Sequence, residues 1–559
     1  MTIVTRRVEK FFYANIECEM KNQEWLYMDE KAIAIIVTRK DEERYQEQIR
    51  YLQELIIPAG YEASILTVDA GNSQAAMYQY AMRKSSAKYK IYIKPETFII
   101  NKYFLSNIVS VFRENDKVGI IGVYGTKQLS TTGRLSESSD IYGRILLADG
   151  TQLKGAAMEN DIVQVMALSD AVIATQYDVD WREDIFLGQE CGFLIESQCI
   201  EFVRNGYNCV VPQQDDYWVI APSETNEYDI DNQNKFLDEY SMEIYPLVSV
   251  VIPTYQRINL FKQALESVLN QSYRNLDIFI TDNSPGNQTA ELVSTYQKND
   301  RRITYEHHPD FDASDNWKRA IEYNNKQAEY VNWLMDDDVF LPEKISVMMD
   351  YFFKYSQVSL VTSYRKLIDL NGSFYTDAEF NLPIVDKTSI VSGDVVGKQI
   401  LLRQINFIGE PTTALIKKSC MLNNRLGWTG REGKYLISDF PTWLRCMSIG
   451  DLIYIREPLS YFRIHEKQGQ NEMEARINGA IAWAIEIQNA INKRLFLKDD
   501  LECRKAIIRW FSRYIPLLDV IGVDTFEQDN YKDLLKIFES MARALNNGYY
   551  IDFEVDTSA

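Results

Sequence analysis

Apolar runs recur at a nearly constant interval in the second half of the chain. Runs with the character of strands begin at Val248, Leu276, Ile303, Tyr330 and Val358, so neighbouring runs start 27 or 28 residues apart. A βαβ unit needs about 30 residues, so this interval predicts parallel strands joined by helices. The first run, VSVVI, is apolar throughout, as is typical of a strand covered on both faces. We therefore expect an α/β fold with an open, Rossmann-like, mostly parallel sheet.

The segments between these runs have helical spacing. After Asn259, which we expect to cap a helix, apolar residues recur at positions 260, 261, 264, 265, 268 and 269. Pro342 suits the first turn of another helix, whose apolar side carries Ile345, Met348, Met349 and Phe352. From about Asn471 the pattern stays helical, which predicts a C-terminal helical region over residues 471–559.

The first half repeats the strand pattern more weakly. KAIAIIVT, EASILTVD, KYKIYI and KVGIIGVYG predict four strands, and AKYKIYIKPETFII lies 241 residues before AEYVNWLMDDDVFL. The chain therefore predicts two tandem domains of one kind, over residues 31–240 and 245–470, after an N-terminal extension of residues 1–30.

Composition excludes several classes of protein. The chain has 559 residues and a net charge of −20, which disfavours nucleic-acid binding because phosphates need a positive face. Seven scattered cysteines without a CxxC pair argue against a zinc cluster or a disulfide scaffold, and with three histidines any metal must rely on carboxylates. No apolar run approaches the ~20 residues that cross a bilayer. We expect a cytoplasmic protein, and peripheral membrane association stays open.

The most informative stretch is YVNWLMDDDVFLPEK, in which Asp336, Asp337 and Asp338 follow a strand. Ligands of open α/β sheets bind beyond the carboxyl ends of the strands. Adjacent carboxylates repel one another, and a cation such as Mg²⁺ or Mn²⁺ relieves that repulsion while bridging to phosphates. The plainer explanation is a solvated acidic turn before the Pro342 helix.

Together with its neighbours, this stretch resembles a known enzyme family. YPLVSVVIPTYQR, then a helix ending in SVLNQSY, then LDIFITDNS and YVNWLMDDDVFLPEK resemble, in this order, the family 2 glycosyltransferases with the GT-A fold. The resemblance covers about residues 246–470. It implies a metal-dependent, inverting transfer of a sugar from a nucleotide-sugar, usually linked to UDP, to a hydroxyl of a glycan, glycolipid or glycoprotein, as in bacterial surface glycan synthesis.

The resemblance also implies roles for single residues. The turn after the first strand would frame the nucleotide, and Asp282 would contact the base. The implied nucleotide-sugar-binding residues are Pro253, Thr254, Tyr255, Arg257, Asp282, Asn316, Asp336 and Asp337. The implied ligands of a Mn²⁺ or Mg²⁺ cofactor are Asp336, Asp337, Asp338 and His465.

On the acceptor side, Asp439 in LISDFPTWLR occupies the position of the family's catalytic base. Gly409, Glu410 and Trp443 would lie near the acceptor. The residues alone leave simpler interpretations open. Asp439 could be a helix N-cap, Asp282 a turn residue and His465 a surface histidine. A base on the face opposite the leaving group suits a single displacement with inversion.

The N-terminal copy lacks most of these groups. The interval of 241 residues places Pro95, Glu96 and Thr97 at the three aspartates, and an interval of 244 residues places Ile195 at Asp439 and Ala221 at His465. TVDAGNSQAAMYQYAM, KVGIIGVYG and WREDIF resemble the glycosyltransferase-like family named for a streptomycin-biosynthesis protein. We predict a degenerate, non-catalytic GT-A-like copy that scaffolds the second copy or holds acceptor.

Two other functions remain open at this point. A sugar nucleotidyltransferase would favour a glycine-rich phosphate loop, whereas the turn here is PTYQR. A non-catalytic carbohydrate-binding or assembly subunit would use aromatic residues, and 35 tyrosines are present. Such a subunit has no need for the acids of the second copy. The sequence leaves a homo-oligomer open and does not identify the sugar.

Overall fold

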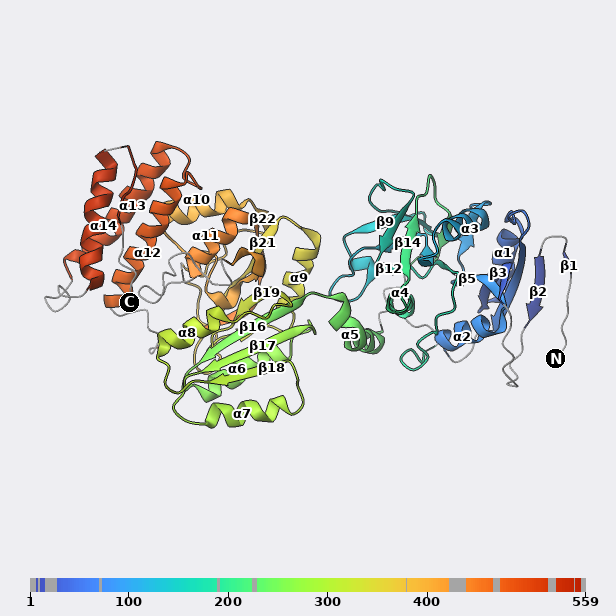
Figure 1. The fold of residues 1–559 in the computed structure, drawn as a ribbon, viewed down its shortest axis with the longest axis horizontal. Coiled ribbons are helices and arrows are strands. Elements are labelled where there is room, and N and C mark those ends of the chain that lie inside the picture. Colours follow the sequence, from blue (N-terminus) through green and yellow to red (C-terminus); the bar gives the residue numbers. More distant parts are fainter. Residues whose placement is uncertain are drawn as a thin grey trace. The chain divides into compact units, whose positions relative to one another are not determined.

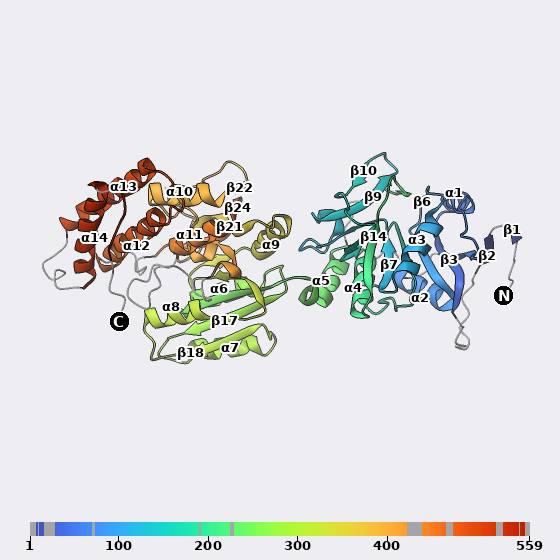
Figure 2. The same ribbon diagram turned by 45° about the horizontal axis from the view of Figure 1, so that its top comes forward.

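The computed structural model places the chain in two compact units, Met1–Ile244 and Tyr245–Ala559. The structure describes residues 28–69, 73–188, 192–223, 229–378, 380–421, 439–465, 473–520, 529–546 and 548–553, together with the backbone of residues 7–8 and 11–15. Each unit is an α/β structure built around its own sheet (Figures 1 and 2). The predicted fold class is confirmed in both halves of the chain.

The sheet of the second unit contains all five predicted strands. They are β16 (Leu247–Thr254), β17 (Leu276–Asp282), β18 (Ile303–His307), β19 (Ala328–Trp333) and β21 (Val358–Ile368). β18, β17, β16 and β19 lie side by side and run parallel. Their carboxyl ends therefore open on one edge, where the sequence motifs begin.

Four shorter or later strands complete this sheet and make it mixed. They are β20 (Val339–Phe340), β22 (Ser389–Val391), β23 (Leu415–Lys417) and β24 (Asp451–Arg463). β23 inserts antiparallel between β19 and β21, and β24 runs parallel to β21. The carboxyl end of β24 therefore lies near the turn that follows β19.

Helices α6 (Ile258–Leu269) and α9 (Lys344–Lys354) form as predicted, but both predicted starts were wrong. Asn259 lies inside α6, because the helix begins one residue earlier, after Arg257 at the N-cap position. Pro342 precedes α9, because β20 and the turn after it occupy that part of the chain. The other helices of the sheet region are α7 (Gln288–Gln297), α8 (Ala313–Glu322), α10 (Gly393–Arg403) and α11 (Asp439–Ile449).

The C-terminal helices share a hydrophobic core with the sheet region. They are α12 (Met473–Asn492), α13 (Asp500–Leu518) and α14 (Asp529–Asn546); α12 and α13 pack against α10, and α14 packs against α12 and α13 (Figure 1). The ring of Phe440 on α11 stacks on Trp483 of α12 with centroids 3.9 Å apart. The helical region is therefore part of the second unit's packing. Within the described residues, no helix combines the length and apolarity needed to cross a bilayer.

The first unit is built on a similar sheet. In spatial order its strands are β1 (Arg7–Val8), β2 (Phe11–Asn15), β4 (Glu62–Asp69), β3 (Asp29–Arg39), β5 (Ala87–Ile93), β13 (Val172–Thr175), β7 (Val118–Gly122), β14 (Asn208–Pro212) and β11 (Ile162–Val165). A second sheet contains β12 (Ala167–Leu168), β8 (Tyr124–Thr126), β9 (Ile141–Leu147), β10 (Gln152–Lys154), β15 (Val219–Ala221) and β6 (Phe98–Ile99). The helices are α1 (Glu42–Gln53), α2 (Gln74–Lys84), α3 (Phe104–Glu114), α4 (Leu194–Arg204) and α5 (Ile230–Ile244).

The two units repeat one order of elements. β5, a turn, β6 and α3 in the first unit correspond to β19, a turn, β20 and α9 in the second, and β6 precedes β20 by the same 241 residues. β13 inserts antiparallel between β5 and β7, as β23 does between β19 and β21. The internal comparison of the sequence therefore has a structural basis.

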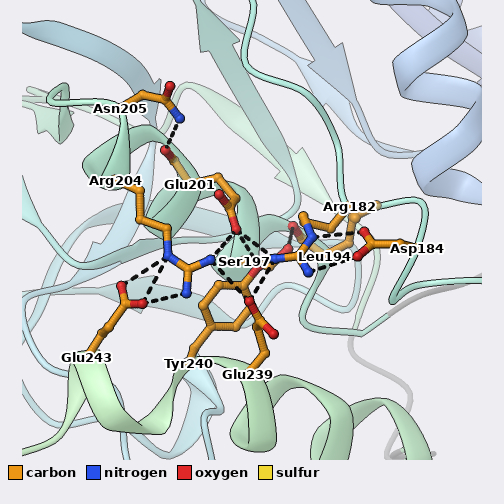
Figure 3. Close-up of polar contacts among 10 residues, drawn as sticks. All are labelled: Arg182, Asp184, Leu194, Ser197, Glu201, Arg204, Asn205, Glu239, Tyr240 and Glu243. Atoms are coloured by element: carbon orange, nitrogen blue, oxygen red, sulfur yellow. Dashed lines mark hydrogen bonds and ion pairs between the residues drawn. The ribbon is translucent and has the colours of Figure 1, made fainter.

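A network of ion pairs links α5 to the rest of the first unit (Figure 3). Arg182 Nη1 lies 3.0 Å from both Glu201 Oε1 on α4 and Glu239 Oε1 on α5. Arg204 Nη1 contacts the same two carboxylates at 2.7 and 3.2 Å. Because Arg182 belongs to the WREDIF segment, that segment has a structural role here.

Candidate active site

The acidic turn after β19 is buried against the turn that follows β16. Asp336 Oδ2 accepts hydrogen bonds from Thr254 Oγ1 at 2.9 Å and from the Tyr255 backbone N–H at 3.2 Å. Arg257 Nη1 lies 3.1 Å from Asp336 Oδ1 and 2.7 Å from Asp337 Oδ2. The parallel pairing of β16 and β19 brings these residues together, although they are about 80 positions apart in the chain.

Asp337 meets His465 at the same edge of the sheet. His465 Nε2 lies 2.9 Å from Asp337 Oδ2, and the two side chains are 6% and 9% exposed. His465 follows β24 by two residues. The structure thus brings together Asp337 and His465, two of the implied cation ligands, from positions 128 residues apart.

Asp338 points in another direction and is held by protein groups. Its Oδ2 accepts a hydrogen bond from Thr412 Oγ1 at 2.6 Å, and its Oδ1 accepts one from the Arg463 backbone N–H at 3.0 Å. The buried Arg463 side chain also donates from Nε to the Asp337 carbonyl at 2.7 Å. Asp338 and Arg463 therefore fix the shape of the acidic turn.

Burial and mutual repulsion perturb the acids of this turn. Burial, and then the charge of Asp337, raises the pKa of Asp336 to about 6, although Arg257 and Thr254 act in the opposite direction. The same two causes raise the pKa of Asp338 well above its usual range. A positive charge placed here would relieve this repulsion.

Asp439 is the first residue of α11, on the other side of the site. Asn406 Nδ2 donates a hydrogen bond to Asp439 Oδ2 at 2.8 Å. Burial is the main cause that raises the pKa of Asp439 to about 6, and the charge of Glu410 adds to it. A carboxyl group with such a pKa is suited to general-base chemistry near neutral pH.

The predicted acceptor-side residues surround Asp439. Trp443 Nε1 donates to the Gly409 carbonyl at 3.0 Å. Glu410 forms an ion pair with the buried Arg365 of β21, with Nε and Oε2 2.6 Å apart. Glu410 precedes the 3₁₀ turn η2 (Pro411–Thr413), which also holds Asp338 through Thr412.

The predicted nucleotide-framing residues line the ends of β16 and β17. Asp282 is buried, and its oxygens accept hydrogen bonds from the Ser284 backbone N–H and the Tyr305 hydroxyl, both at 2.8 Å. Asn316 is also buried and donates to the Thr254 carbonyl at 3.2 Å. Pro253 is the penultimate residue of β16, and Tyr255, just after the strand, is half exposed. Asp282 and Asn316 support the turn, and contact of Asp282 with a base stays a prediction.

The residues present fit a cation that is shared with a substrate. Across the described part of the chain, no group of three or more His, Cys, Asp or Glu side chains is arranged to hold a metal ion. Asp337 Oδ2 meets His465 and also the partly exposed Arg257. Asp336 and Asp338 are each held by hydroxyl and backbone donors of the protein. Carboxylate oxygen and imidazole nitrogen are donors that Mn²⁺ accepts, and the oxygens of a diphosphate supply the others.

Three residues that hold the site together were not predicted. Arg463, Thr412 and Asn406 act through contacts with Asp338 and Asp439. Arg463 carries no local signal for this role, because it ends β24 and acts on Asp338 across the sheet. Thr412, in the short turn η2, and Asn406, in the loop before it, carry no such signal either.

The corresponding turn of the first unit lacks this arrangement. Pro95, Glu96 and Thr97 follow β5 where the three aspartates follow β19; Glu96 is exposed and Thr97 is buried. Ile195 lies buried in the first turn of α4, where Asp439 begins α11. Asp69 at the end of β4 is paired with Arg39, whose Nε lies 2.7 Å away.

Two α/β units, of which the second carries acids at its strand ends, a partly buried base candidate and a carboxylate–imidazole pair, define a glycosyltransferase of the GT-A type. Family models agree: one described as "Glycosyltransferase like family" matches residues 34–240, and one described as "Glycosyl transferase family 2" matches residues 249–407. A Campylobacter jejuni protein named GalNAc(5)-diNAcBac-PP-undecaprenol beta-1,3-glucosyltransferase is 31% identical over 306 residues, which are 54% of this chain and 90% of that protein. The chain belongs to glycosyl transferase family 2.

Other similar proteins cover less or are more distant. An uncharacterized glycosyltransferase of Rickettsia felis is 34% identical over 120 residues, so the match spans 22% of this chain and 19% of that protein. The crystal structure of residues 1–349 of TarS from S. aureus is 13% identical, covers 55% of this chain and 83% of that chain, and superposes with a TM-score of 0.40.

Proposed function

We propose that the second unit transfers a sugar from a UDP-sugar to a hydroxyl of a lipid-linked glycan, with inversion and with the help of Mn²⁺ or Mg²⁺. The observation that supports it most is the pairing of Asp337 with His465, together with the partly buried Asp439 that Asn406 holds. The named Campylobacter relative, a glucosyltransferase of an undecaprenol-linked glycan, suggests the kind of acceptor.

In this proposal each side of the site has its own task. The turn after β16 and the support from Asp282 frame the nucleotide. Asp337 and His465 would hold the cation, and Arg257, whose side chain is 33% exposed, would face the diphosphate. A bound divalent cation stabilises the negative charge that develops on the departing nucleotide.

Asp439 then acts on the acceptor. Its carboxylate would take the proton of the acceptor hydroxyl while that oxygen forms the new bond to the sugar and the nucleoside diphosphate leaves. Gly409, Glu410 and Trp443 shape the acceptor side around it. Because donor and acceptor must be aligned, much of the rate depends on how firmly these groups are positioned.

We further propose that the first unit does not transfer sugar and instead supports the second unit or holds acceptor. Its turn after β5 has one exposed acid, Glu96, and Ile195 stands where a base is needed. We assign the chain to the bacterial cytoplasm, at the membrane surface when its acceptor is lipid-linked.

The direct test is transfer by the full-length chain. We would incubate it with a panel of UDP-sugars, Mn²⁺ and a polyprenyl-diphosphate-linked oligosaccharide, and follow UDP release and product mass. One donor should give product with inverted anomeric configuration, and Asp439→Asn should abolish transfer while Glu96→Gln preserves it. Full transfer by Asp439→Asn would contradict the proposal. So would an equal rate of UDP release with every UDP-sugar of the panel.

A further inference from the structure

Asn406 lies in the loop between α10 and η2, and its side-chain amide makes three contacts. Its Nδ2 donates to Asp439 Oδ2 at 2.8 Å and to the Gly409 carbonyl at 3.0 Å. Its Oδ1 accepts a hydrogen bond from the Gly409 backbone N–H at 3.2 Å. The amide therefore hydrogen-bonds to the backbone N–H and carbonyl of Gly409 and to the carboxylate of Asp439 on α11.

These contacts leave one orientation for the amide. Only the NH₂ group can donate to two oxygens, and only the carbonyl oxygen can accept from the Gly409 N–H. A flipped amide would set its oxygen against the oxygens of Gly409 and Asp439 and lose all three bonds. Asn406 therefore presents a hydrogen-bond donor to Asp439.

Gly409 makes the frame around this amide rigid. Its φ of +111° is strained for residues other than glycine, and an added Cβ would lie 2.6 Å from Thr413 Oγ1. The Gly409 carbonyl also accepts a hydrogen bond from Trp443 Nε1, one helical turn after Asp439. The loop and the first turn of α11 are thus tied together at Gly409.

We propose that Asn406 is a positioning residue for the base: anchored on Gly409, it fixes the plane of the Asp439 carboxylate and keeps it ionised at neutral pH. This inference rests on the proposed function, because it assumes that Asp439 is the base. A donor bonded to a carboxylate favours the charged form.

The charged surroundings of Asp439 agree with this role. Glu410 acts on Asp439 as a like charge, and Arg365 of β21 pairs with Glu410. Hydrogen bonds oppose the rise in the pKa of Asp439, first that of the Phe440 backbone N–H and then that of the Asn406 side chain. Removal of Asn406 should therefore weaken this counterweight to burial and Glu410.

The test is the pH profile of sugar transfer by the full-length chain. In Asn406→Leu, the acid limb of kcat should move to higher pH by about one unit, since a hydrogen bond to a charged group is lost. Asn406→Asp, nearly identical in shape, should move it further because it adds a like charge. The effect on kcat should shrink at high pH, where Asp439 is ionised in every variant.

Asn492 offers a matched control. Its side-chain Nδ2 donates to the Ile551 carbonyl at 2.8 Å, and its Oδ1 accepts from the Ile551 backbone N–H at 3.2 Å. Neither of these two hydrogen bonds involves a carboxylate. Asn492→Leu should lower the melting temperature without moving the acid limb. The inference would be overturned if the acid limb of kcat stayed at the wild-type pH in both Asn406 variants. If instead Asp439→Asn retained transfer, the proposed function itself would fail, so the two failures are distinguishable.

Discussion

The setting of Asp439 predicts how activity and stability change with pH. Its pKa is raised from an ordinary 3.8 to about 6, chiefly by burial. A base must be ionised to act, so transfer should be lost as the pH falls through about 6. At pH 5 the ionised fraction, and with it kcat, should be about a tenth of its plateau value.

The same shift makes the ionised carboxylate costly to the fold. Because the folded protein takes up the proton at higher pH than the unfolded chain, stability rises as the pH falls from about 6 toward 4. A pKa raised from 3.8 to about 6 corresponds to about 3 kcal/mol at neutral pH. The residue is partly exposed, so we expect that Asp439→Asn, which mimics the protonated form, gains about 2 kcal/mol at pH 7.5.

Two assays check this reasoning. Initial rates at saturating donor give the acid limb, and urea unfolding at two pH values gives the free energy of unfolding of wild type and Asp439→Asn. Asp499→Asn changes an exposed N-cap of α13 and should leave the pH profile as it is. A rate that stays flat between pH 5 and 7, or an Asp439→Asn protein that is less stable than wild type at pH 7.5, would refute it.

Three further substitutions test the framework. Thr412→Val removes the hydroxyl that donates to buried Asp338 and should cost about 1–3 kcal/mol of stability, measured by urea unfolding, and lower kcat. In Gly409→Ala the added Cβ is strained by the positive φ and lies too close to Thr413, so the substitution should lower the free energy of unfolding by about 1–3 kcal/mol. It should change kcat more than it changes the KM for the donor. Arg182→Met should destabilise the first unit by about 1 kcal/mol, with a smaller loss in high salt, because its ion pairs are partly exposed. An unchanged unfolding midpoint in any of the three would contradict the corresponding contact.

The strand rhythm of the second half predicted much of the fold, for a physical reason. β16, β17 and β19 are buried parallel strands, and burial on both faces makes their sequences largely apolar. β20 and β23 span two and three residues and have too little sequence to form a pattern. The start of α6 was misjudged because Arg257, at the N-cap position, makes no side-chain capping bond, so no local cap signal marks it.

The site shows the same division between local and distant information. Asp337 and Asp439 stand out through motifs near them in the sequence. Asn406 and Arg463 act on residues 33 and 125 positions away, so their roles depend on how loops and strands meet in space. The role of Asp338 differs from that of its neighbour Asp337 for a similar reason, since Thr412 engages only one of the two.

The central claim is that Asp337 and His465 hold a divalent cation against the nucleotide diphosphate. The most direct measurement is a calorimetric titration of Mn²⁺ into the full-length chain saturated with UDP. We expect one binding event that disappears in Asp337→Asn and persists in Glu96→Gln, which changes the corresponding turn of the first unit. Equal Mn²⁺ binding by wild type and Asp337→Asn would contradict it.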